Sequence, residues 1–314
     1  MNIHGNALSV KELNVVNGCQ SLSTIYSTSE AAKKAKNAYI LFRFYEIDDS
    51  NRADNITTST NSQSAVKARD LRSNDKSVLL MKKAYEQYYD DGYFITKRGE
   101  KVDSVKYNSA HIVNLTDLGK YLIAWHSQRP TISYSETKIF DKYFDQLFRR
   151  DYNPEDIQAL QELFSNIIVK WTKDNPMDLN ETLLAMKAYA PYHQLYAISV
   201  VFCEINKMND SVPSPSVVLK KLQTSNMLDE VVNLTGDCLN KALENASEVA
   251  TENNKIFVPQ NWIKSKTSLK DIKSAIKYYL SMLKMISGGK ELQEKLSTSL
   301  AMDKEDFQSR WTAD

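Results

Sequence analysis

Residues 38–47 read Ala38-Tyr39-Ile40-Leu41-Phe42-Arg43-Phe44-Tyr45-Glu46-Ile47, and this stretch decides how the front of the chain is expected to fold. Its residues are apolar and aromatic on both faces of an extended segment, a pattern typical of a strand in the middle of a sheet. A polar stretch lies on each side of it in the sequence. The pattern therefore predicts a small α+β part in which one buried strand connects two polar clusters.

The polar stretch before this strand is Val15-Val16-Asn17-Gly18-Cys19-Gln20-Ser21. Asn-Gly is a turn dipeptide, so a short strand is expected to end there and a helix to begin near Gln20. A helix N-terminus that follows a strand directly presents free amides and a positive dipole end, which favour an anion. An ordinary strand–turn–helix junction explains the same residues equally well. The candidate binding residues are Asn17, Gly18, Gln20 and Ser21.

The polar stretch after the strand runs from Thr57 to Asp75 and contains Asn61-Ser62-Gln63. Asn and Gln side chains both donate and accept hydrogen bonds, so they suit the polar edges of bases, sugars or other amides. Residues 49–75 hold four basic and four acidic residues, a balance that favours a specific polar site over a phosphate track. A solvated helix face with salt bridges is the open alternative. The candidates here are Asn61, Gln63, Lys67, Arg69, Asp70 and Arg72.

A helix is predicted over Lys76–Asp91, followed by a strand at residues 93–96 and a turn, Lys97-Arg98-Gly99-Glu100. The basic residues of this turn could meet phosphate, although a solvated hairpin tip explains them better. From about residue 108 the spacing of apolar residues is helical almost throughout. Helices are expected over residues 112–126, 135–149, 154–171, 180–206, 215–226, 228–251 and 268–286, with Pro191 kinking or splitting the fourth.

This change of pattern predicts two domains, an α+β polar-site domain over residues 1–107 and a larger helical domain over residues 108–314. The fold class is therefore α+β, with a small mixed part followed by a mostly helical one. The net charge of +1 divides unevenly, since the first 150 residues carry 22 basic against 17 acidic residues. A basic front half permits contact with a polyanion without requiring it.

Composition excludes several classes of protein. No run of 18 apolar residues exists, so no membrane span is expected, and the first residues do not resemble a secretory signal. Cys19, Cys203 and Cys238 show no metal-binding or disulfide spacing, which fits a reducing cytoplasm. The four histidines are far apart, and the common phosphate-loop, dinucleotide, hydrolase and zinc-protease motifs are missing. No metal is indicated, and the identity of any cofactor is left open.

One pattern resembles a metal nuclease. Asp117 followed by Glu136-Thr137-Lys138 has the spacing of an acidic residue and a Glu-x-Lys motif, which could hold Mg²⁺ and orient water. Such residues normally project from strands of one sheet, whereas these fall at the starts of two predicted helices. The nuclease hypothesis would require Asp117 and Glu136 to converge within metal-ligand distance.

Together, Val15–Ser21, Asn55–Val66 and Arg69-Asp70-Leu71 resemble the AIPR family, the bacterial abortive-infection phage-resistance proteins. The family pattern is a Val-Asn-Gly-(Cys/Gln)-Gln-Thr turn followed by an Asn-x-Gln-Asn-x-Val region, with Ser21 and Ser64 as mild departures. The resemblance covers roughly residues 8–170. Family members usually carry a further N-terminal region, so the chain is expected to be a fragment or a short form.

A fainter likeness connects the Asn17–Gln20 turn and the Asn61-x-Gln63 region with the Asp-Gly-Gln-His-Arg proteins of DNA-modification systems, which resemble ParB-type nucleotide-binding folds. The His-Arg pair of those proteins is replaced here by Ser21-Leu22, which argues against ParB-like phosphate chemistry.

The resemblance implies a cytoplasmic phage-defence protein. Its front half is expected to bind DNA, RNA or a nucleotide, with Arg69 and Arg72 on phosphate and the amides on polar edges. The second hypothesis is an interaction scaffold without catalysis of its own, which senses a phage protein or holds a partner of the defence system. Loss of ligand binding in an Arg69→Ala/Gln20→Ala variant would separate the two.

Overall fold

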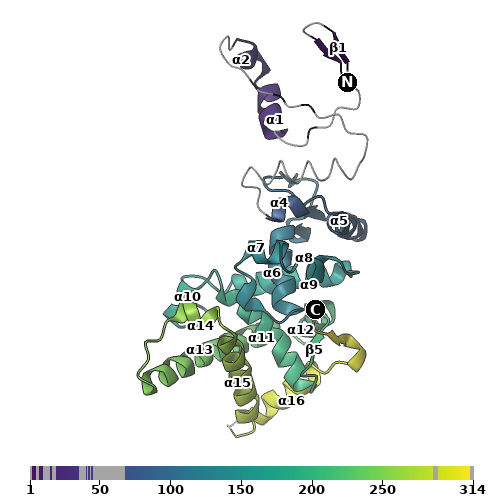
Figure 1. Ribbon diagram of the computed structural model, residues 1–314. Helices are drawn as coiled ribbons and strands as arrows, with labels where there is room; N and C mark the ends of the chain where they lie inside the picture. The colour runs from purple at the N-terminus through teal and green to yellow at the C-terminus, as the bar shows by residue number, and fades with distance from the viewer. Residues whose placement is uncertain are drawn as a thin grey trace. The chain divides into compact units, whose positions relative to one another are not determined.

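The computed structural model describes residues 2–4, 7–9, 15, 19–34, 40, 42, 44, 68–285 and 289–311. The chain divides into two compact units, residues 1–67 and residues 68–314. The described part is α+β with mainly helical character, which confirms the predicted fold class (Figure 1). The predicted boundary at residue 107 lies inside the second unit, where Tyr85 and Phe94 belong to the same buried cluster as Leu160.

The first unit has two short strands and two helices among its described residues. β1 (Asn2–His4) pairs antiparallel with β2 (Ala7–Ser9), and α1 (Cys19–Ser27) and α2 (Ser29–Lys34) follow. The helix predicted to begin near Gln20 is therefore confirmed. The predicted central strand is described only at Ile40, Phe42 and Phe44, which lie outside strands and are about half exposed. An apolar pattern makes a central strand only when strands pair on both sides, and none does so at these three residues.

The second unit opens with the elements that later carry the candidate site. They are α4 (Ala68–Arg72), α5 (Lys76–Tyr88), β3 (Tyr93–Ile95), η1 (Ser109–His111), β4 (Ile112–Asn114) and α6 (Leu115–Trp125). β3 and β4 are parallel, with Phe94 opposite Val113, and both side chains are buried. Asp75 caps α5 and Asn114 caps α6, each by accepting a hydrogen bond from a backbone amide of the first turn.

The helical remainder follows in chain order. Its elements are η2 (Pro130–Ile132), α7 (Glu136–Phe140), α8 (Phe144–Phe148), α9 (Pro154–Ile168), α10 (Glu181–Ala185), α11 (Ala190–Ile205), β5 (Ser211–Pro213), α12 (Pro215–Thr224), α13 (Leu228–Glu252), α14 (Pro259–Ile263), α15 (Lys266–Met282), α16 (Gly289–Ser299), η3 (Lys304–Asp306) and β6 (Phe307–Ser309). β5 and β6 pair antiparallel. None of the described helices is both long and apolar enough to cross a bilayer.

α11 is the centre of this unit. Every residue from Ala190 to Cys203 is buried, and the helix contacts α6, α9, α13 and α15 (Figure 1). A helix that is apolar on all sides has no face for solvent and is covered by its neighbours. Pro191 lies in its first turn, so the predicted split of the 180–206 pattern is confirmed. Inside this core, Gln194 accepts a hydrogen bond from Trp171 Nε1 at 2.6 Å.

The helix predicted over residues 135–149 is two helices, α7 and α8. Arg72 Nε donates a hydrogen bond at 3.3 Å to the carbonyl oxygen of Phe140, the last residue of α7. In an uninterrupted helix that carbonyl would accept from the amide of Phe144 instead. A residue from distant α4 thus bonds the backbone at the break, and apolar spacing within residues 135–149 carries no sign of this contact.

Gly119→Ala is expected to lower the free energy of unfolding by about 1–2 kcal/mol. A Cβ on Gly119 would lie 2.8 Å from Ile139 Cγ2, and crowding of a branched side chain outweighs the helical gain of alanine. Gly236→Ala is the matched control, because its nearest contact would be the sulfur of Met177 at 3.3 Å. Urea unfolding of both variants measures the difference. Equal stabilities would show that α6 and α7 pack less closely than described.

Candidate functional site

The residues predicted to bind a ligand fall in different parts of the structure. Asn17, Gly18, Asn61, Gln63 and Lys67 lie outside the described residues. Gln20 and Ser21 lie in the first turn of α1, where Ser21 is exposed. Arg69, Asp70 and Arg72 lie on α4 in the second unit. The predicted binding residues up to Lys67 thus belong to the first unit and those from Arg69 onward to the second, and their joint role stays a prediction.

Arg69 is the most buried of the candidates whose side chains the structure describes. Its side chain is only 2% exposed, although a guanidinium is costly to remove from water unless it is paired. Nε donates a hydrogen bond to Thr116 Oγ1 at 3.1 Å, and one terminal nitrogen lies 3.4 Å from Asp70 Oδ1. These contacts fix the guanidinium against the start of α6.

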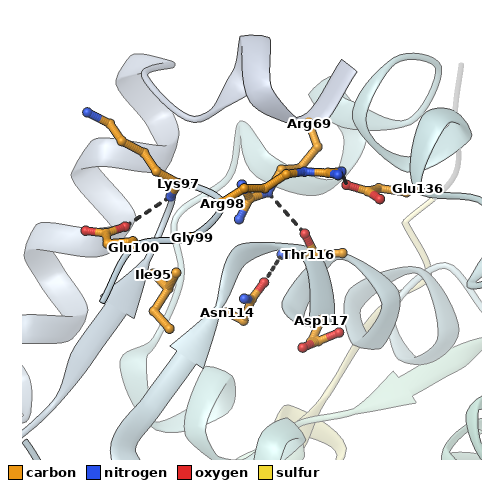
Figure 2. Close-up of a pocket in the computed structure, with 10 residues that line it drawn as sticks. All are labelled: Arg69, Ile95, Lys97, Arg98, Gly99, Glu100, Asn114, Thr116, Asp117 and Glu136. Carbon is orange, nitrogen blue, oxygen red and sulfur yellow. Dashed lines mark hydrogen bonds and ion pairs between the residues drawn. The ribbon is translucent and has the colours of Figure 1, made fainter. Parts of the chain in front are cut away.

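Arg98 lies beside Arg69 and connects three segments of the chain (Figure 2). Its Nε lies 3.0 Å from Asp70 Oδ1, and its Nη2 contacts Glu136 Oε1. Arg98 is also 39% exposed, so a molecule from solvent can reach it. The arginine therefore joins α4 to α7 while part of its surface stays accessible.

The loop that carries Arg98 is held by Glu100. One oxygen of this carboxylate accepts hydrogen bonds from the amides of Thr96 and Lys97, both at 3.1 Å, and the other accepts from the Tyr93 hydroxyl at 2.5 Å. Burial raises the pKa of Glu100, but these hydrogen bonds together lower it by more, so the net shift of the pKa is downward. The hydrogen bond to Glu100 raises the pKa of Tyr93 to about 12. Glu100 is thus an ionised structural residue and a poor proton donor.

The first turn of α6 forms another side of this site. Asn114 Oδ1 accepts from the Thr116 amide at 2.8 Å, and Asp117 is the next residue of the helix. The positive end of the helix dipole therefore faces the same space as the two arginines.

These elements surround an open cavity of about 380 Å³, which we call the arginine pocket (Figure 2). Its lining includes three basic and three acidic residues: Arg69, Lys97, Arg98, Glu100, Asp117 and Glu136. The Lys97 side chain extends away from the two arginines, so Arg69 and Arg98 supply the positive charge nearest the cavity (Figure 2).

Arg72 does not line the arginine pocket. Its guanidinium lies over the Phe144 ring, 4.2 Å from the ring centre, and its Nε bonds the Phe140 carbonyl. These contacts hold α4 against α7 and α8, a packing contribution that arginine makes through its flat, weakly hydrated head. The structure thus separates three neighbouring candidates: Arg69 lines the pocket, Asp70 bonds its arginines, and Arg72 packs outside it.

The nuclease-like residues do come together, since Asp117 and Glu136 both line the arginine pocket. However, Asp117 pairs with Lys120 at 2.9 Å, and Glu136 contacts Arg98. Among the described residues, no group of three or more His, Cys, Asp or Glu side chains is placed to hold a metal ion. Both carboxylates are therefore paired with cationic side chains in the described part of the chain.

Sequence reasoning identified Arg69 and Asp70 but treated Arg98 as a solvated turn and gave Thr116 no role. The signal that could have helped was the run Lys97-Arg98-Gly99-Glu100 directly after a strand. Gly99 has a φ of 69°, which lets the chain turn back sharply there. Nothing local indicates that this turn lies next to α4.

Comparison with known proteins gives one match. Residues 3–282 match the family model described as AIPR protein. No curated protein and no solved structure matches the chain.

Proposed function

Because the chain belongs to the AIPR family of abortive-infection, phage-resistance proteins, we propose that it is a cytoplasmic phage-defence protein that binds nucleic acid or a nucleotide at the arginine pocket. Arg69 and Arg98 bind a phosphate group of the ligand, together with the N-terminus of α6. A separate proposal concerns the candidates of the first unit, which bind polar groups such as the edges of bases or sugars: Asn17, Gly18, Gln20, Ser21, Asn61, Gln63 and Lys67.

The observation that carries this proposal is the buried guanidinium of Arg69 at the wall of an open cavity. An arginine held by Thr116 has little rotamer freedom left to lose, so binding an anion costs less entropy than it would for a free surface arginine. Arginine also matches the geometry of phosphate with two parallel donors. Arg98 adds an accessible second guanidinium from the loop after β3.

The pocket is lined by equal numbers of acidic and basic residues, which limits how many phosphate groups a ligand can place there. A protein that follows a nucleic-acid backbone neutralises many phosphates, and its affinity then falls steeply with salt. Among the described residues that line this cavity, two carry a guanidinium group and three carry a carboxylate. We therefore expect one or two phosphate groups to be bound. The affinity should then fall only weakly as the salt concentration rises.

A thermal-shift panel tests the proposal. The full chain is mixed with nucleoside mono-, di- and triphosphates, single- and double-stranded DNA, and RNA, with and without Mg²⁺. A ligand at about 100 times its dissociation constant adds roughly 2.7 kcal/mol to stability, which such an assay detects. Arg98→Gln is expected to weaken binding by roughly tenfold or more, because a hydrogen bond to a charged group contributes about 1.5–3 kcal/mol.

Arg149→Gln is the matched control for this panel. Arg149 is an exposed arginine that pairs with Asp145 at 2.9 Å and does not line the pocket, so its replacement should leave binding unchanged. Gln20→Ala separately tests the candidate binding residues of the first unit. A panel in which no compound shifts the wild-type chain would contradict the proposal.

The interaction scaffold is the second candidate, and exposed apolar side chains favour it. Val249 is 55% exposed, Ile256 is 93% exposed and Val258 is 41% exposed, and the three lie close in sequence at the end of α13 and beyond. Apolar residues gathered on a surface often mark a protein contact. The scaffold would be favoured if no compound in the thermal-shift panel raises the melting temperature and Ile256→Ser abolishes phage resistance.

A further inference from the structure

Trp311 occupies a slot at the other end of α6 from the arginine pocket. Its indole stacks on the imidazole of His126, with ring centres 3.9 Å apart and an angle of 8° between the planes. The Tyr152 ring meets it edge-on at 5.7 Å, and the Arg150 guanidinium lies 4.8 Å from the indole. We call this arrangement the Trp311 slot.

The indole is held there through its backbone as well as its ring. The Trp311 amide donates to the His126 carbonyl at 2.9 Å, and Gln146 Nε2 donates to the Trp311 carbonyl. Gln146 Nε2 also donates to Ser127 Oγ at 2.9 Å. The strand that precedes Trp311, β6, is only three residues long, and within the described part of the chain its pairing partner is β5. A short strand with one partner can detach without unfolding the helices beneath it.

The polar atoms around the indole are poorly satisfied. His126 Nδ1, Gln146 Oε1 and the Tyr152 hydroxyl are all buried without a hydrogen-bond partner. These are three of the six such side-chain atoms in the described part of the chain. Native proteins rarely leave buried polar groups unpaired, so such a concentration around one residue needs an explanation.

A ligand that fills the slot and also offers hydrogen bonds would explain both features. Nucleic-acid-binding proteins stack bases on histidine rings and arginine guanidiniums, and they read the base edges with side-chain amides and hydroxyls. His126, Arg150, Gln146 and Tyr152 are this combination of side chains. Burial and the nearby Arg150 lower the pKa of His126 to about 3, so the imidazole that stacks is neutral.

We propose that the Trp311 slot is a binding site for a nucleobase. The side chain of Trp311 fills this site when no base is bound. The base stacks on His126 in place of the indole and hydrogen-bonds the side chains of Gln146 and Tyr152. Trp311 competes with the base, so the apparent affinity falls with the fraction of molecules in which the slot is filled.

This site is separate from the arginine pocket and does not depend on the function proposed there. The pocket lies at the first turn of α6, whereas His126 directly follows its last residue, Trp125. A helix of 11 residues is about 16 Å long. Nucleosides lack the phosphate group that the arginine pocket is proposed to bind, so they separate the Trp311 slot from that pocket.

Calorimetric titration of the full chain with adenosine, guanosine, cytidine and uridine tests the proposal. Trp311→Ala is expected to bind at least one of them roughly tenfold more tightly than the wild type, because the competing ring is gone. Adding Tyr152→Phe, which removes only the hydroxyl, should cancel much of the gain. Arg98→Gln should leave it unchanged, which separates this site from the arginine pocket.

Trp311→Ala with an unchanged circular dichroism spectrum and no gain for any nucleoside would overturn the proposal. If that variant does not fold, hydrogen exchange of the wild-type chain decides the question. A bound base that displaces the indole should speed exchange at the amides of Phe307–Ser309 and Trp311, including the Trp311 amide that bonds His126. Unchanged exchange at saturating concentrations of all four nucleosides would also overturn it.

Discussion

Gln194→Leu is expected to lower the free energy of unfolding by about 2–3 kcal/mol, because it leaves buried hydrogen-bonding groups without partners. Gln194 has no exposed surface. Its Oε1 accepts from Trp171 Nε1 at 2.6 Å, and its Nε2 donates to the Val232 carbonyl at 2.7 Å. Leucine keeps most of the volume but pairs with neither. The amide joins α11, α13 and the segment after α9 at the centre of the unit.

Urea unfolding at neutral pH measures this effect, and a double-mutant cycle assigns it. Trp171→Phe removes the indole donor, so Trp171→Phe/Gln194→Leu should lose less stability than the sum of the single variants. Gln223→Leu is the control, because Gln223 is exposed and bonds Glu162 on the surface. Additive single effects would mean that the hydrogen bond between Trp171 and Gln194 contributes little.

The second large effect is expected on acidification from pH 7 to about pH 5. Burial, with a smaller contribution from Arg150, lowers the pKa of His126 to about 3. Burial lowers the pKa of His193 to about 4, although its hydrogen bond to the Tyr189 carbonyl opposes the shift. An unfolded histidine has a pKa of about 6.5. Between these values the unfolded chain binds more protons than the folded chain, so stability is full above the unfolded pKa and falls as the pH decreases.

At about pH 5 each histidine is expected to cost roughly 2 kcal/mol relative to neutral pH. Urea midpoints measured across this range give the total, and His126→Gln and His193→Gln should each remove about half of it. A chain whose stability does not change between pH 7 and 5 would show that both imidazoles are accessible to protons in the folded state.

The sequence alone predicted much of the helical architecture. The spacing of apolar residues predicted α5, α6, α9 and α13, and Pro191 indicated the division between α10 and α11. The turn at Asn17-Gly18 and the amide-rich stretch indicated the AIPR family, and the match over residues 3–282 confirms it. Such features are local, because a helix period, a cap or a motif depends on residues within a few turns of one another.

The break between α7 and α8 and the composition of the arginine pocket were not predictable in this way. Arg69 Nε and Thr116 Oγ1 are 47 positions apart, and Arg98 and Glu136 are 38 apart. The composition of residues 49–75 marked Arg69 and Arg72 as equivalent, yet one lines the pocket and the other packs on Phe144. Adjacent turns of a short helix face different neighbours, and only the packing of α4 decides which arginine meets which.

The sequence by itself determined most of the helices, the break before Pro191 and the family, because these follow from short-range periodicity and steric preference. Only the tertiary structure decided that Arg98 joins Arg69, that His126 is held neutral, and that Trp311 fills a slot of unpaired polar atoms. Burial and the proximity of charges depend on which distant segments pack together, and they set both the pKa of a group and the cost of leaving it unpaired.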